Sequence, residues 1–394
     1  MQSLEGIRVL ELGHILAAPF LAMMMGDMGA DVIKIEPPGR GDESRHFGPP
    51  FLNGVTSYFL CLNRNKRSIT LNLKNPDGAG VLRRLIEKSD VLVENFRPGS
   101  LAKLGFSYEA ARKINPAIIY CSISGFGVTG PLADKAAFDP IVQGLGGVMS
   151  LTGPEEGLPY KTGVPIGDLT TAMLAAFAIV SALFHRQRTG VGQFIDSSLL
   201  DGQIALLTFQ GAAYLATGEV PKRMGNRHPS IVPYQIFPTA DRYINICVGS
   251  DALWERFCPA VGLTEYQNNP RFYTNVERVK HREELIPLIE RRFKEFTTAE
   301  LIKILEEAGV PCGEVATLDE VFSNPQVAHL NIVQELEHPV AGRIKLTAPP
   351  YRMSETQPTI RRRPPLLGEH TAELLEWLGY SEEHIAALRQ SGAV

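Results

Sequence analysis

Short apolar runs alternate with helical segments along the N-terminal half of the chain. Four runs have the length of buried strands: 7–12, 31–35, 91–93 and 117–122. A Met-rich helical segment extends to residue 28, and an amphipathic helical segment at 78–88 follows the breaker Asn75-Pro76-Asp77-Gly78. Strands that alternate with helices build βαβ units, so we predict an α/β fold with a mostly parallel sheet and ligands at its carboxyl edge.

The character of the sequence changes near residue 217. Residues 218–231 are rich in Gly, Pro and basic side chains, which indicates a linker. Residues 232–325 combine short strands with charged helices and predict a smaller α+β domain. From 326 to 394 the pattern returns to extended pieces and ends in two helices. Residues 1–217 are then the N-terminal part of a large, Rossmann-like domain.

Composition limits the classes of function. The chain has 394 residues and a net charge of −4, which suits two domains and leaves no basic surface for nucleic acid. Its five cysteines form no Cys-x-x-Cys pair, so neither a disulfide framework nor a metal site is expected. The N-terminus lacks the features of a secretory signal, and the apolar stretch 169–184 is too short and polar for a membrane span. We expect a cytoplasmic enzyme with no membrane partner and no bound cofactor.

Asp168 lies at the start of a long apolar helical segment that Thr189-Gly190 closes with a C-cap signal. An Asp in such a place is ordinarily an N-cap, which accepts hydrogen bonds from free backbone amides. Asp196, ahead of Ser197, receives the same interpretation. The alternative for Asp168 is that its carboxylate is a nucleophile, and the other motifs of the chain favour that alternative.

One motif suggests a different chemistry. Residues 125–130 read Gly-x-Gly-x-x-Gly after a predicted strand, which is the fingerprint of dinucleotide binding. Pro131 follows at once, no amphipathic helix opens there, and the unit is not the first βαβ of the chain. We therefore do not expect a nicotinamide cofactor.

Seven motifs, and their order along the chain, are similar to those of one known family. They are Leu4-Glu5-Gly6-Ile7-Arg8-Val9-Leu10, Gly26-Asp27-Met28-Gly29-Ala30-Asp31, Asn63-Arg64-Asn65-Lys66-Arg67, Asn95-Phe96-Arg97-Pro98-Gly99, Gly125-Phe126-Gly127, Gly167-Asp168 and Pro365-Leu366-Leu367-Gly368-Glu369-His370-Thr371. The set resembles the family III CoA-transferases (the CaiB/BaiF group), which contain formyl-CoA transferase and 2-methylacyl-CoA racemase. The resemblance implies an acyl-CoA:carboxylate CoA-transferase. It also implies an interlocked homodimer whose large domain is built from both termini, so that 326–394 returns to it.

The resemblance also implies roles for particular residues. Asp168 would be the catalytic carboxylate, forming an anhydride with the acyl group and then a thioester with CoA. The reaction rate would come from two sources: the thioester carbonyl is held against Asp168, and hydrogen-bond donors stabilise the developing oxyanion. The residues that match CoA contacts of the family are His14, Ala17, Leu71, Lys74, Asn95, Phe96, Arg97 and Lys103. Taken singly, the three cations could be solvated surface charges and His14 a structural histidine.

Some positions depart from well-known members of the family. Formyl-CoA transferase has Gln where this chain has Leu16, and a glycine run where this chain has Gly249 followed by Ser250, so formate and oxalate are not expected as substrates. The racemase branch has a proton-carrying His where this chain has Phe138, which cannot exchange a proton. A racemase remains the alternative function, and an acyl-CoA-binding protein without activity is a third, in which Asp168 is only a cap.

The segment 226–235 resembles the succinyl-CoA:glutarate branch of the family, and Leu16 agrees with that branch too. This similarity implies a dicarboxylate acceptor, with Arg227 or His228 meeting the second carboxylate, and Phe138 and Gly249 beside the substrate. The other interpretation is that the segment merely begins the small domain.

Overall fold

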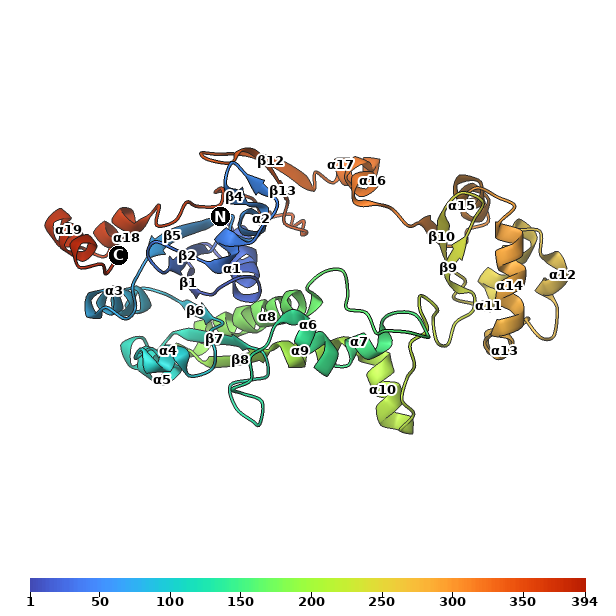
Figure 1. Cartoon of the computed structure of the whole chain (residues 1–394), viewed down its shortest axis with the longest axis horizontal. Helices are drawn as coiled ribbons and strands as arrows, with labels where there is room; N and C mark the ends of the chain where they lie inside the picture. Colours follow the sequence, from blue (N-terminus) through green and yellow to red (C-terminus); the bar gives the residue numbers. More distant parts are fainter. The chain divides into compact units, whose positions relative to one another are not determined.

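The computed structural model describes residues 1–394 and divides into two compact units. Unit 1 comprises Met1–Val148, Lys161–Glu219 and Pro325–Val394, and unit 2 comprises Met149–Tyr160 and Val220–Asn324 (Figure 1). The expected division placed 149–160 in the large domain. In the structure this segment belongs to unit 2, where the amide of Gly225 donates to the carbonyl of Gly153.

Unit 1 contains a six-stranded sheet in which every neighbouring pair is parallel. Its order is β5 (Lys66–Thr70), β2 (Asp31–Glu36), β1 (Arg8–Leu12), β6 (Val91–Glu94), β7 (Ile119–Ser124) and β8 (Phe194–Ser198). The direction of strand addition reverses between β1 and β6. Loops diverge at such a switch point, which makes the carboxyl edge there the expected ligand site.

Helices cover both faces of this sheet. One face packs against α3 (Pro76–Glu87), α5 (Tyr108–Ile114), α18 (Thr371–Trp377) and α19 (Glu382–Gln390). The other face packs against α1 (Ala17–Asp27), α8 (Ile166–Thr189) and α9 (Leu199–Leu206). The C-terminal helices therefore complete the core of the large unit.

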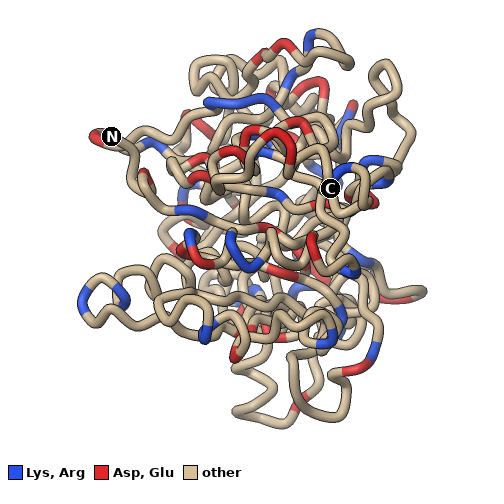
Figure 2. Tube along the Cα trace, turned by 90° about the vertical axis from the view of Figure 1, so that its left-hand side faces the viewer, with Lys and Arg blue, Asp and Glu red and all other residues tan.

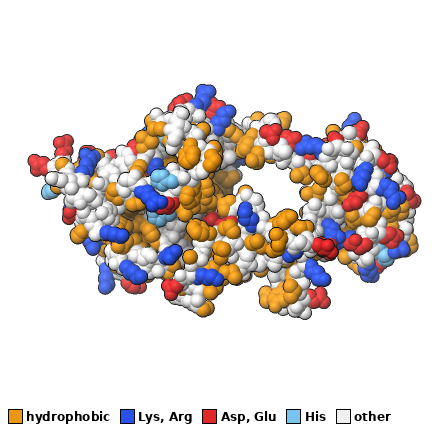
Figure 3. Space-filling view, viewed as in Figure 1, with side chains coloured by type: hydrophobic (Ala, Val, Ile, Leu, Met, Phe, Trp, Pro, Cys, Tyr) orange, Lys and Arg blue, Asp and Glu red, His pale blue; other side chains and the backbone are white.

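Helix α8 is long and apolar enough to cross a membrane by length and composition alone. One of its faces is buried on the sheet, through residues such as Ala172, Ala175 and Ile179. Its other face exposes large apolar side chains: Met173, Leu174, Phe177, Val180 and Phe184. Hydrophobic side chains also gather over the neighbouring α6 (Asp139–Leu145) and α10 (Thr208–Thr217) (Figure 3).

Unit 2 contains a three-stranded antiparallel sheet ordered β11 (Cys312–Glu314), β10 (Tyr243–Cys247) and β9 (Tyr234–Pro238). Helices α11 (Asp251–Ala260), α14 (Arg282–Phe293) and α15 (Thr298–Glu307) supply its core, which includes Trp254, Phe257 and Phe293. Acidic and basic residues are interspersed along the trace of the chain (Figure 2).

The remaining elements are short. They are the 3₁₀ helix Glu43–His46, β3 (Phe51–Leu52), β4 (Val55–Thr56), α2 (Ser57–Leu62), α4 (Ser100–Lys103), α7 (Val148–Leu151), α12 (Thr264–Gln267), α13 (Asn275–Lys280), α16 (Leu318–Ser323), α17 (Pro325–His329), β12 (Val333–His338) and β13 (Gly342–Thr347).

Candidate active site

A cavity of about 210 Å³ opens at the carboxyl edge of the unit 1 sheet. The loops after four strands line it: His14–Ala17 after β1, Asn95–Pro98 after β6, Gly125 after β7 and Leu199 after β8. Asp168, from the first turn of α8, lines it as well. The site therefore lies at the switch point of the strand order, where parallel sheets bind ligands.

A second cavity of about 460 Å³ adjoins the first. It lies at the ends of β1, β2 and β5, and Leu71 and Lys74 line it. His14 and Phe96 line both cavities, and their rings meet edge to face with centroids 5.0 Å apart. We call the two cavities, which share these two side chains, the groove; Asp168 lines the first cavity but not the second.

Most residues predicted to bind CoA line this groove. His14, Ala17, Asn95, Phe96 and Arg97 line the first cavity, and His14, Leu71, Lys74 and Phe96 line the second. Lys103, exposed on α4, lines neither cavity. The Asn95 amide is bonded to the backbone of His14, with its Oδ1 accepting from the His14 amide at 2.8 Å and its Nδ2 donating to the His14 carbonyl at 2.9 Å. Asn95 therefore holds the loop after β1 with its side chain.

Asp168 is not a helix cap. Asp168 is the third residue of α8. The N-cap residue of this helix is Pro165, whose side chain cannot accept a hydrogen bond. Asp139 on α6 does so instead, because its Oδ1 accepts a hydrogen bond of 2.7 Å from the amide of Gly167. The interpretation of Asp168 as an N-cap is therefore wrong, and its carboxylate is left facing the cavity.

Burial, together with the nearby charge of Asp139, raises the pKa of the Asp168 carboxyl to about 7. Removal from water disfavours the ionised form, and a second carboxylate adds repulsion. Both conditions arise from the fold, since Asp139 is held by the Gly167 amide and by Gln143 Nε2 at 2.6 Å. A strongly perturbed carboxyl in a cleft is a candidate for chemistry.

Comparison with known proteins identifies the family. The family model described as "CoA-transferase family III" matches residues 4–371. The chain belongs to this family. It is 44% identical over 395 residues to a succinyl-CoA:glutarate CoA-transferase of Mus musculus, covering 100% of this chain and 91% of the relative. A succinate--glutarate CoA-transferase of Agrobacterium fabrum is 42% identical, with 94% of each chain covered.

Solved structures agree with this assignment. A CAIB/BAIF family protein from Brucella suis superposes with a TM-score of 0.85 at 40% identity, covering 96% of this chain and 99% of its own. Rv3272 from M. tuberculosis superposes with a TM-score of 0.84 at 28% identity, covering 94% and 98%. The protein is therefore an enzyme, a CoA-transferase with the fold of the CaiB/BaiF proteins.

Sequence analysis missed three residues at the transferase site. Burial raises the pKa of Tyr58, on α2, to about 12, and the charge of Asp168 is the next cause, so the phenol lies within electrostatic reach of the carboxylate. Lys135 lines the cavity from the loop before α6. Asp139 caps α8 across 28 residues of sequence. Only Asp139 carried a signal in the sequence, because it directly follows Phe138, the position at which the racemase branch has its proton-carrying His.

The glycine loop after β7 forms a wall of the transferase cavity. A Cβ at Gly125 would lie 2.2 Å from the Cβ of Ala137, so this close approach requires glycine. The next helix, α6, begins only at Asp139, so no helix N-terminus opens directly behind the loop as dinucleotide binding requires.

Asp196 lies in β8 and its Oδ2 accepts from the amide of Val128 in this loop at 3.1 Å. The prediction that Asp196 caps a helix is wrong, because Ser198 caps α9.

The predicted substrate residues divide between the two units. Phe138 lines the Asp168 cavity and is 66% exposed. Arg227 and His228 belong to unit 2, where Arg227 pairs with Glu155 and Glu283. Burial lowers the pKa of His228, and the charge of Arg282 contributes, so the imidazole is neutral at physiological pH. Gly249, also in unit 2, is exposed after β10.

Proposed function

We propose that the transferase moves CoA from succinyl-CoA to a small dicarboxylate such as glutarate, through covalent intermediates on Asp168. The observation that carries the proposal is the position of the Asp168 carboxylate, which is half-buried, does not cap α8 and lines the first cavity of the groove. The relatives named for succinyl-CoA and glutarate support the choice of acids. The racemase alternative is not favoured, because Phe138 offers no proton carrier.

The steps balance with carboxylate chemistry alone. An oxygen of Asp168 attacks the thioester carbonyl and CoA thiolate leaves, which forms a mixed anhydride. The thiolate then attacks the aspartyl carbonyl, releases the first acid and forms an aspartyl-CoA thioester. The second acid attacks the aspartyl carbonyl of this thioester, CoA thiolate leaves again, and a new anhydride forms. Thiolate attack on its acyl carbonyl releases the new acyl-CoA and restores Asp168.

The start of α1 can supply the oxyanion donors. The first bond of this helix runs from the Phe20 amide to the Leu16 carbonyl, at 2.7 Å, and Pro19 has no amide hydrogen. The amides of Ala17 and Ala18 therefore have no acceptor within the helix. Ala17 lines the same cavity as Asp168, and a helix N-terminus favours negative charge. We assign these two amides to the oxyanion that forms opposite Asp168.

The acceptor proposal predicts a preference for dicarboxylates. With succinyl-CoA as donor, we expect kcat/KM for glutarate to exceed that for butyrate by about ten- to a hundredfold, because a charge-assisted hydrogen bond contributes about 1.5–3 kcal/mol. Steady-state kinetics with the two acids measures this ratio. Arg227→Met should reduce it. Arg223→Met, which loses bonds to the carbonyls of Pro154 and Gly157, is the control in unit 2. Equal values for the two acids would leave a CoA-transferase but remove the dicarboxylate claim.

We infer that the enzyme is a homodimer. The exposed apolar face of α8, together with Ile141 and Leu145 of α6, would be covered by a second copy. Light scattering should detect no folded monomer on dilution to nanomolar concentration, as expected for interlocked chains. Phe177→Asp, at a side chain that is 74% exposed, should reduce the yield of dimer, whereas Gln187→Asp on the same helix should not. A stable wild-type monomer would refute the inference.

A further inference from the structure

The loop after β1 contains a strained residue next to the proposed oxyanion donors. Ile15 has φ +67°, a left-handed conformation that β-branched residues rarely adopt. Such strain persists only where the surroundings hold it in place, and it concentrates at functional sites. Leu16 follows as the N-cap residue of α1, so the conformation of Ile15 sets the direction in which the first amides of α1 point.

Side chains form hydrogen bonds with the backbone of this loop at three consecutive residues. Lys34 Nζ donates to the Gly13 carbonyl at 3.0 Å, and the Asn95 side chain bonds both the amide and the carbonyl of His14. The amide of Ile15 donates to Asp42 Oδ1 at 3.1 Å. The last bond acts directly on the strained residue.

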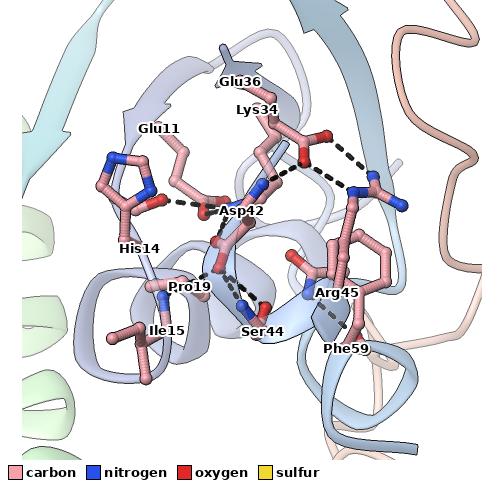
Figure 4. A network of polar contacts seen from close by, with 12 residues as sticks. Glu11, His14, Ile15, Pro19, Lys34, Glu36, Asp42, Ser44, Arg45 and Phe59 are labelled. Atoms are coloured by element: carbon pink, nitrogen blue, oxygen red, sulfur yellow. Dashed lines mark hydrogen bonds and ion pairs between the residues drawn. The ribbon is translucent and has the colours of Figure 1, made fainter. Parts of the chain in front are cut away.

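Asp42 belongs to a buried network of charges (Figure 4). Its Oδ2 meets Lys34 Nζ at 2.7 Å, and Lys34 also meets Glu11 at 2.6 Å. Its Oδ1 accepts from both the amide and the hydroxyl of Ser44 at 2.8 Å. Both carboxylate oxygens of Asp42 are therefore held by partners, which positions the acceptor of the Ile15 amide.

Stability alone does not account for so many buried charges. Glu11, Lys34 and Lys66 are all fully buried, and Lys66 meets Glu11 at 2.8 Å. Replacing buried ion pairs by apolar residues of similar size is often neutral or stabilising. Lys34 counters the effect of burial on Asp42 and holds the pKa of that carboxyl well below its usual range, so Asp42 stays an acceptor. What the network provides beyond stability is a rigid acceptor for the Ile15 amide.

We propose that Asp42 is a positioning residue of the transfer reaction, which holds Ile15 in its left-handed conformation and so aims the Ala17 and Ala18 amides at the carbonyl opposite Asp168. The proposal rests on the proposed function, because it needs an oxyanion to form there. Asp42 itself lines neither cavity of the groove.

The test combines Asp42→Ala, which removes the acceptor of the Ile15 amide, with Ile15→Gly. Asp42→Ala should lower kcat by at least about tenfold, as loss of an oxyanion donor does, with little change in the KM for acyl-CoA. Glycine adopts positive φ without strain, so Ile15→Gly in the Asp42→Ala background should recover most of the lost kcat. If Asp42 served stability alone, the added glycine would give no recovery. Single-turnover release of CoA thiol isolates the first chemical step.

Two further variants keep the result interpretable. Asp27→Ala removes a buried carboxylate that pairs with Arg64 and does not contact the loop, so it should lower the melting temperature but not kcat. If Asp42→Ala does not fold, Ser44→Ala removes one hydrogen bond to Asp42 and leaves its ion pair, and Ile15→Gly should rescue its smaller loss of kcat. An unchanged kcat in Asp42→Ala, or a loss that Ile15→Gly does not relieve, overturns the proposal. Failure of the wild-type enzyme to transfer CoA between acids would instead overturn the proposed function.

Discussion

Asp168→Asn should abolish CoA transfer, with turnover falling by at least about 10⁴-fold, as removal of a covalent nucleophile does. The amide occupies the same volume but cannot form an anhydride. Because Asp168 lines only the first of the two cavities, CoA binding measured by calorimetry should remain close to that of wild type. Wild-type enzyme incubated with acyl-CoA and hydroxylamine should be modified at Asp168, and the variant should not. Transfer near the wild-type rate in the variant would refute the mechanism.

The same substitution should stabilise the protein. The pKa of Asp168 is raised from 3.8 to about 7 in the folded state, so the native protein binds more protons than the unfolded chain between those values. This group therefore makes the free energy of unfolding fall as pH rises from about 4 to about 7, with no further loss above that. Asp168→Asn should melt at a higher temperature than wild type at pH 8 but not at pH 4. Equal melting temperatures at pH 8 would show that the carboxylate is not destabilised by its site.

The pH dependence of activity is the second large effect that we expect. Asp168 must be ionised to attack, so kcat/KM for acyl-CoA should fall about tenfold for each pH unit below about 7 and level off above it. Asp139→Asn removes a charge that raises this pKa, and its Oδ1 can still accept from the Gly167 amide. The inflection of the profile should therefore move to lower pH.

Asp134→Asn is the matched control for this experiment, because Asp134 lies in the same loop region and does not act on the pKa of Asp168. Its profile should coincide with that of wild type. A wild-type rate that stays level down to pH 5 would mean that Asp168 is not the titrating nucleophile.

Local patterns predicted most elements of the large unit. The apolar runs near 7–12 and 91–93 are β1 and β6, and the helix predicted at 78–88 is α3, because strand length and helical period are written in neighbouring positions. This helix begins two residues earlier than predicted, at Pro76, because Asn75 caps it rather than breaking it. The segment from 47 to 65, with β3, β4 and α2, was not predicted, because such short elements lack a clear period.

The candidate site was predictable in part. Family motifs pointed to Asp168 and to the loops after β1 and β6, and the groove contains them. The residues that control Asp168 were not predictable, since Asp139 caps α8 from another helix. A local rule also failed at Asp196, because an Asp-Ser-Ser sequence does not say which of its side chains faces the free amides of the next helix. Contacts of this kind depend on how helices and strands pack, which no window of sequence contains.

The position of α18 and α19 in the core has a consequence for the order in which the protein forms. All six strands of the large sheet are complete at Ser198, yet Leu374, Leu375, Ile385 and Leu388 are needed to cover one of its faces. During synthesis the part of that face not covered by α3 and α5 stays exposed until α18 and α19 have been made. Unit 2 ends at Asn324 and has its own core, so it can fold first. We therefore expect the catalytic unit to be finished last, and a chain that stops before Thr371 to expose its apolar face to aggregation.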